Sequence, residues 1–262
     1  MGIKFSFKDK YGIDDLRQIM KLLRSPDGCP WDIEQTHGSI RSNVIEEAYE
    51  VAEAIDSQSD VDLCEELGDL LLQIVFHSQI ARESEEFDFD DVTDGVCKKL
   101  ILRHPHVFGD LKVNDSAEVL NNWDAIKKVE KQQLTYTDTL KSVPKAFPSL
   151  MRMQKVLKRA EKAGIDFDSK NSVADRVSRT VEGLETLGTV EDKQQIRKAL
   201  GDLLTDTARL CRLYGLEAEE LLAESTDRFI DCFSSVERDF IESGLDMKQQ
   251  SECVLREKWQ KK

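Results

Sequence analysis

The sequence predicts an all-α fold of antiparallel helical bundles, for three reasons. Apolar residues recur at intervals of three and four over long stretches, the period of a helix with one buried face. Only 5 Pro and 13 Gly occur in 262 residues, few for a sandwich or barrel rich in turns. Charged residues form 34% of the chain, which suits solvated helix faces, and an apolar content of 40% supports a buried core.

The first predicted elements form a helical hairpin. One helix is expected over residues 39–55 and the next over 60–83, with Asp60 able to cap the second. A polar break at 56–59 separates them, and helices joined by so short a connection should pack antiparallel. The apolar positions of the two helices are Ile40, Val44, Ala48, Val51, Ile55, Leu63, Leu67, Leu70, Leu71, Ile74, Val75 and Ile80.

Proline and glycine divide the rest of the chain. A helix that starts at Asp90 or Asp91 should end near Arg103, before Pro105, and another is expected over 116–132. The next stretch contains Pro144 and Pro148 and is the best linker candidate. The predicted domains are therefore residues 1–134 and 149–262, joined by a linker at 135–148.

Two acidic motifs on the predicted hairpin point to chemistry. Glu46-Glu47-Ala-Tyr-Glu50 lies on the first helix and Glu66-Leu-Gly-Asp69 on the second. Residues three apart share a helix face, so two acidic pairs would meet across one groove. Such carboxylates repel each other unless a cation lies among them, and all-oxygen ligands select a hard ion, Mg²⁺ or Mn²⁺. The alternative, a set of solvated surface acids, is weakened because the second motif borders an apolar helix face.

Longer strings flank these motifs, and together they resemble the MazG family of all-α nucleoside triphosphate pyrophosphohydrolases. The strings are Cys29-Pro30-Trp31-Asp32, Gln35-Thr36-His37 and the RHPHVFGD of residues 103–110. The resemblance covers nearly the whole chain. It implies tandem bundles completed by dimerisation and an Mg²⁺-dependent hydrolase, with Mn²⁺ as a possible substitute. Water would attack the α-phosphorus of (deoxy)nucleoside triphosphates and release the monophosphate and pyrophosphate, a house-cleaning reaction of the nucleotide pool.

The resemblance also implies roles for single residues. The metal ligands would be Glu47, Glu50, Glu66 and Asp69. From its position beside them, Glu46 is a candidate to orient or deprotonate the attacking water. The candidate cations for the phosphates are Lys98, Lys99 and Arg103, unless these are simply solvated basic residues, and Trp123 either lines the base pocket or is a buried anchor.

The second half repeats the first in outline. Leu67-Gly-Asp-Leu-Leu recurs as Leu200-Gly-Asp-Leu-Leu, which favours a duplicated unit over chance similarity. Ala199 stands in the place of Glu66, however, and only Asp202 survives from the second acidic motif. Residues 179–183 are the best match to the first motif and lack acids at its positions. We therefore predict a weak or inactive C-terminal site, in a half that serves packing and dimer formation.

Composition narrows the partners and the setting. A net charge of −14 repels a nucleic acid backbone on average. No apolar run reaches the ~20 residues that span a bilayer. Six cysteines without a C-x-x-C pair favour a reducing cytoplasm. We expect nucleoside triphosphates and a second copy of the chain as partners, and neither nucleic acid nor membrane.

Two other functions are compatible with a helical chain of this kind. A non-catalytic nucleotide-sensing or protein-interaction module would agree with the altered second half. A di-iron or metal-storage bundle needs two E-x-x-H motifs, and Glu34-x-x-His37 has no second one beside the other carboxylates. The hydrolase is the hypothesis that the intact first half favours.

Overall fold

A computed structural model describes residues 5–165, 168–186 and 193–260, and every regular element in these ranges is a helix. The all-α prediction is therefore confirmed for this part of the chain. Two compact units are present, Met1–Ile126 and Lys127–Lys262, and each is described by itself. Over the same ranges, none of the helices has the length and apolar character required to cross a membrane.

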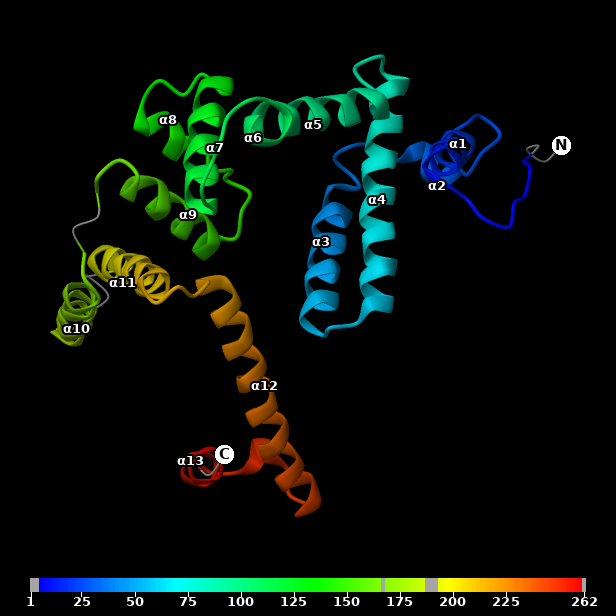
Figure 1. Ribbon diagram of the computed structural model, residues 1–262. Helices are drawn as coiled ribbons and strands as arrows, with labels where there is room; N and C mark the ends of the chain where they lie inside the picture. Colours follow the sequence, from blue (N-terminus) through cyan, green and yellow to red (C-terminus); the bar gives the residue numbers. More distant parts are fainter. Residues whose placement is uncertain (1–4, 166–167, 187–192, 261–262) are drawn as a thin grey trace. The chain divides into compact units, whose positions relative to one another are not determined.

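The N-terminal unit is organised around a hairpin of α3 (Arg41–Asp56) and α4 (Asp60–Glu83). The two helices lie side by side and run antiparallel, as their short connection predicted (Figure 1). Helix α1 (Ile13–Leu23) packs against α4. The remaining elements of this unit are α2 (Pro30–Glu34), α5 (Phe89–Arg103), α6 (Pro105–Phe108) and the first part of α7 (Ser116–Glu130).

Two helix starts differ slightly from the predicted ones. The side chain of Ser59, not Asp60, caps α4 by accepting a hydrogen bond from the backbone N–H of Asp62 at 3.3 Å. Helix α5 begins at Phe89 because Asp88 caps it and forms a reciprocal capping box with Asp91. Both starts therefore follow from side chains that satisfy free backbone N–H groups.

A small core holds the N-terminal unit together. Its fully buried members come from α1, the turn before α3, and the second half of α4, and Phe89 packs against them. Arg24 braces this core, because its guanidinium donates to both carboxylate oxygens of Glu83, to the carbonyl of Gln35 and lies over the ring of Phe76. The buried members are Met20, Ile40, Val75, Phe76 and Ile80.

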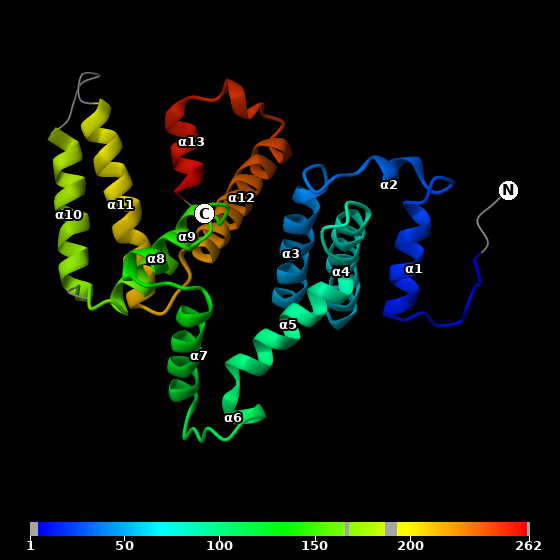
Figure 2. The same ribbon diagram turned by 90° about the horizontal axis from the view of Figure 1, so that it is seen from above.

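The C-terminal unit contains a second hairpin, α10 (Lys170–Thr186) and α11 (Lys193–Leu213), whose helices also lie side by side (Figure 2). Helix α9 (Ser149–Glu161) packs against α11 and against α12 (Ala218–Glu242). Its other helices are α8 (Tyr136–Lys141), the short 3₁₀ helix η2 (Met247–Gln249) and α13 (Glu252–Trp259).

The segment predicted as a linker, 135–148, is folded against its neighbour. It contains α8, and Val143 is fully buried. Arg159 of α9 donates to the carbonyl of Thr139 and, at 2.8 Å, to the hydroxyl of Ser142. Arg159 therefore joins α9 to the segment 135–148. The division of the chain at 134 and 148 stays a prediction.

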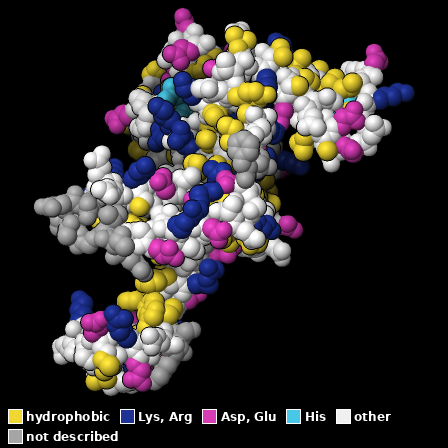
Figure 3. Space-filling model, turned by 90° about the vertical axis from the view of Figure 1, so that its left-hand side faces the viewer, with side chains coloured by type: hydrophobic (Ala, Val, Ile, Leu, Met, Phe, Trp, Pro, Cys, Tyr) yellow, Lys and Arg dark blue, Asp and Glu magenta, His cyan; other side chains and the backbone are white. Residues whose placement is uncertain are grey.

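Many apolar side chains remain exposed on the described surface, and Figure 3 shows some of them among charged residues on one face. Exposed apolar patches larger than those of ordinary monomers mark interaction surfaces. The α3–α4 hairpin alone leaves several large apolar residues more than a third exposed. These are Ile45, Tyr49, Ile55, Val61, Leu67, Leu71 and Ile74.

Candidate metal centre

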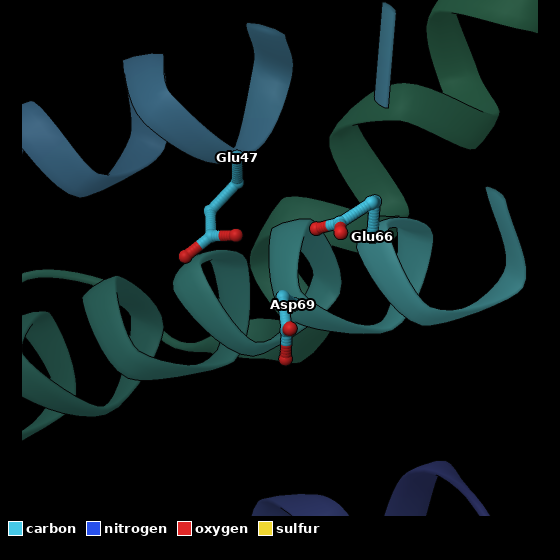
Figure 4. A group of neighbouring side chains, drawn as sticks. All are labelled: Glu47, Glu66 and Asp69. Atoms are coloured by element: carbon cyan, nitrogen blue, oxygen red, sulfur yellow. The ribbon is translucent and has the colours of Figure 1, made fainter. Parts of the chain in front are cut away.

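Three carboxylates meet between the helices of the first hairpin. Glu47 comes from α3, and Glu66 and Asp69 come from successive turns of α4 (Figure 4). One carboxylate oxygen from each residue lies within 4.8 Å of the other two. Oxygens on opposite sides of a bound Mg²⁺ stand about 4 Å apart, so small side-chain rotations would bring all three onto one ion. The donor set is all oxygen, which fits a hard cation.

The carboxylates of the cluster affect one another's pKa. Burial raises the pKa of Glu47, and the charges of Asp69 and Glu50 raise it further. The pKa of Glu66 is also raised, first by burial and then by the charges of Glu50 and Asp69. The charges of Asp69 and Glu50 therefore make Glu47 and Glu66 harder to ionise, and a divalent cation would reverse this effect.

The other two predicted acids lie on α3 beside the cluster. Glu50 is outside the group of three, but it is close enough to act on the pKa of both Glu47 and Glu66. Glu46 is exposed, next to Glu47 in the chain. The arrangement brings four of the five predicted acids into electrostatic contact and leaves Glu46 at the solvent-facing edge.

The predicted phosphate-binding and base-binding residues form two groups, a contacting pair, Arg103 and Trp123, and two exposed lysines of α5. The guanidinium of Arg103, at the end of α5, lies over the ring of Trp123 from α7, 5.3 Å from its centroid. Trp123 is half-buried, and this burial is compatible with both predicted roles, a wall of the base pocket and a buried anchor. Lys98 forms an exposed ion pair with Asp94 at 2.6 Å, and Lys99 is exposed on the same helix.

Nearby histidines make local contacts. His37 and His77 stack with their Nδ1 atoms 2.7 Å apart, so one ring donates to the other. Burial and the neighbouring ring lower the pKa of His77. The Nδ1 of His104 pairs with the carbonyl of Leu100 at 2.7 Å, so this side chain satisfies a backbone carbonyl near the end of α5.

Sequence reasoning missed one residue of the site, Gln73. It lies on α4 four residues beyond Asp69 and is buried, and its amide nitrogen donates to Oε1 of Glu47 at 3.3 Å. A signal was available, because Glu66, Asp69 and Gln73 follow the spacing of one helix face. Gln73 stands among apolar residues and belongs to no acidic motif, so the pattern of charges did not reveal it.

The second hairpin has arginines at the corresponding place. Counting from the repeated strings, Asp206 occupies the position of Gln73. Its carboxylate accepts two hydrogen bonds from Arg176 of α10, at 2.8 and 3.2 Å. Arg176 and Arg209 also both bind Asp168, whose pKa is lowered chiefly by Arg176. Arg176 and Arg209 therefore neutralise Asp206 and Asp168.

The two hairpins differ in the residue that makes the contact across to the next helix, Glu47 in the first and Arg176 in the second. When the two Leu-Gly-Asp-Leu-Leu strings are aligned, Thr180 corresponds to Glu47. The residue that binds across to α11 is nevertheless Arg176, one helical turn earlier. Arg176 and Thr180 line one open groove with Asp202 and Asp206.

The two mid-helix glycines have open space beside them. A Cβ at Gly68 or Gly201 would meet no atom within 4 Å. Among the described residues, no other backbone therefore approaches either glycine closely.

Magnesium should stabilise the protein more at neutral pH than in acid. The pKa values of Glu47 and Glu66 are raised in the folded state, so the folded chain binds more protons than the unfolded one just above pH 4.5. Metal-free stability therefore falls as the pH rises through the folded pKa values. Thermal melting with Mg²⁺ and with EDTA, at pH 5 and pH 7, should show the larger Mg²⁺-dependent increase in Tm at pH 7. Equal increases at both values would contradict this electrostatic account.

Both acidic motifs lie in the part of the chain that matches a known family. Residues 35–108, which include both acidic motifs, match the family described as the MazG nucleotide pyrophosphohydrolase domain. The chain is 40% identical to the nucleoside triphosphate pyrophosphohydrolase of Escherichia coli K12, over 95% of both chains. It is 36% identical to the nucleoside triphosphate pyrophosphohydrolase/pyrophosphatase MazG of Thermotoga maritima, over 95% of this chain and 94% of that protein.

Proposed function

Because this chain belongs to the MazG family of nucleotide pyrophosphohydrolases, we propose that it hydrolyses (deoxy)nucleoside triphosphates to the monophosphate and pyrophosphate. The observation that carries the proposal is the meeting of Glu47, Glu66 and Asp69 within 4.8 Å between α3 and α4. The proposed cellular role is removal of unwanted nucleotides from the pool. The proposed setting is the cytoplasm, which fits six free thiols.

The four acids around the groove are proposed to hold Mg²⁺, or Mn²⁺ in its place. Glu47 and Glu50 would contribute from α3, and Glu66 and Asp69 from α4. When bound, the ion supplies positive charge that stabilises the phosphates as water attacks the α-phosphorus. Glu46, at the exposed edge of the cluster, is proposed to orient the attacking water or to accept its proton.

The substrate is proposed to lie between the acidic cluster and the α5–α7 region. Arg103 is held over Trp123 and would offer its guanidinium N–H groups to phosphate oxygens, while the half-buried indole offers a flat surface to the base. Lys98 and Lys99 are proposed as weaker, solvent-exposed contributors to phosphate binding. Lys98 would have to leave its ion pair with Asp94, and an exposed pair of this kind contributes only ~0–1 kcal/mol.

The second hairpin is proposed to be catalytically inactive. It keeps Asp202 at the place of Asp69, but Ala199 stands where Glu66 would be and Arg176 brings a positive charge into the groove. A guanidinium at this position repels a divalent cation. The C-terminal half is therefore proposed to serve packing and assembly.

A homodimer is proposed as the working form of the enzyme. The α3–α4 hairpin exposes large apolar side chains on either side of the acidic motifs, among them Tyr49 and Leu67. Helices of a second copy would bury this surface and complete the bundle around the groove. The proposed partners are thus nucleoside triphosphates and a second chain, with no role for nucleic acid or membrane.

Product identification tests the proposed reaction. A panel of ribo- and deoxyribonucleoside triphosphates should release pyrophosphate with Mg²⁺, and chelation by EDTA should stop the release. Orthophosphate as the sole primary product would reject the proposed site of cleavage. Calorimetric binding of nucleotide without any turnover would favour the alternative of a nucleotide-sensing or protein-interaction module.

A further inference from the structure

Gln73 has a feature that packing alone does not explain. Gln73 is only 6% exposed, and its amide oxygen is buried with no hydrogen-bond partner among the described residues. Leaving a buried polar atom unpaired costs ~1–3 kcal/mol. An apolar side chain of similar length would avoid this cost at a buried position. The stability of the fold alone therefore does not explain a glutamine at this position.

The chemistry of the two side chains fixes the direction of the amide. An ionised carboxylate only accepts hydrogen bonds, so Gln73 must present its nitrogen to Glu47 and turn its oxygen elsewhere. Gln73 thus holds the Glu47 carboxylate in place across the hairpin.

In the second hairpin, the residue that corresponds to Gln73 also binds a side chain of the opposite helix, but with a carboxylate that accepts from a cation. Asp206, the counterpart of Gln73, also reaches across to the neighbouring helix, where it binds the guanidinium of Arg176. In one hairpin an amide holds a carboxylate, and in the other a carboxylate holds a guanidinium. The side chain at this position matches the group that projects into the groove from the opposite helix.

We propose that Gln73 is a positioning residue for the metal site. Its amide nitrogen fixes the Glu47 carboxylate in the orientation of a ligand, and its free oxygen accepts a hydrogen bond from water that enters the site with the ion. Groups that orient metal ligands in this way typically contribute 10–100-fold to metal affinity. This inference rests on the proposed function, because it presupposes that the acidic cluster binds a divalent cation.

Gln73→Met separates positioning from packing. Methionine has a similar length and no strong hydrogen-bonding group, so it keeps the core filled and removes the unpaired oxygen. The expected result is a Kd for Mn²⁺, measured by calorimetry, that rises about tenfold or more. The free energy of unfolding in EDTA should not fall, since no buried polar atom is left behind.

Gln79→Met is the matched control. Gln79 lies on the same helix and also donates to a carboxylate, that of Glu83 at 2.8 Å, but it is not part of the acidic cluster. Its substitution should leave the Kd for Mn²⁺ unchanged. A Kd for Gln73→Met equal to that of the control would overturn the inference. So would a loss of metal-free stability larger than the control's, because that result assigns Gln73 to packing.

Asp69→Asn in the same titration distinguishes failure of this inference from failure of the proposed function. If Asp69→Asn loses Mn²⁺ binding while Gln73→Met binds normally, only the role of Gln73 is rejected. If Asp69→Asn binds Mn²⁺ as tightly as the wild type, the metal site itself is rejected. The affinity is read on the protein and ion alone, so neither outcome depends on turnover.

Discussion

Asp69→Asn is expected to lower kcat/KM for pyrophosphate release by roughly 10³-fold. The substitution keeps the size of the side chain and removes one negative charge from a cluster whose oxygens lie within 4.8 Å of one another. The remaining acids would then hold a divalent cation more weakly, and the phosphates would lose the charge that stabilises the attack by water. Asp69 is exposed, so the fold should not change. Initial rates at saturating Mg²⁺, with circular dichroism to verify folding, measure the effect.

Asp202→Asn is the matched control for this experiment. Asp202 is also exposed and occupies the same place in the repeated Leu-Gly-Asp-Leu-Leu string of α11. Because Arg176 lines the groove beside it, we expect little change in kcat/KM. A comparable loss of activity in both variants would show that the C-terminal hairpin takes part in catalysis. Full activity of Asp69→Asn would remove the proposed site altogether.

Arg176→Met is expected to destabilise the C-terminal unit by about 2 kcal/mol. Arg176 binds Asp206 and Asp168, whose side chains are only 12% and 17% exposed. Removing a partner from a buried pair costs ~3–5 kcal/mol, and the partial exposure of Arg176 itself, at 34%, reduces this figure. Arg209 still pairs with Asp168 and lies 3.8 Å from Asp206, but Asp206 loses both of its hydrogen bonds. Urea unfolding monitored by circular dichroism gives the change in free energy.

An exposed ion pair of the same unit provides the comparison for Arg176. Arg228 pairs with Glu224 on α12 at 3.6 Å, and both side chains are more than 60% exposed. Arg228→Met should change the free energy of unfolding by less than about 0.5 kcal/mol. Equal losses for the two variants would mean that the arginine–aspartate cluster does not stabilise the second hairpin.

The hairpin that carries the site could be predicted from sequence because its signals are local. Apolar residues at intervals of three and four define α3 and α4, and four polar residues between them leave an antiparallel pairing as the simple solution. The spacing of Glu66 and Asp69 then sets one face of α4. What local patterns could not give was the cap at Ser59, since Ser59 and Asp60 are both good capping residues.

The rest of the site depends on contacts between helices, which the sequence does not display. Gln73 belongs to the site because it faces Glu47 across the hairpin. Arg176, and not Thr180, binds Asp206 across the second hairpin. Both cases required the relative axial position of two helices, and periodicity within one helix carries no information about it.

The first hairpin is proposed to bind a divalent cation between its helices, whereas Arg176 lines the corresponding groove of the second hairpin. Crystals grown with Mn²⁺ and measured at a wavelength where manganese scatters anomalously would test this directly. We predict an anomalous peak bounded by Glu47, Glu66 and Asp69, and none beside Arg176 and Asp202. A peak in the second hairpin, or carboxylates of the first hairpin that contact only solvent in the metal-loaded protein, would contradict the assignment.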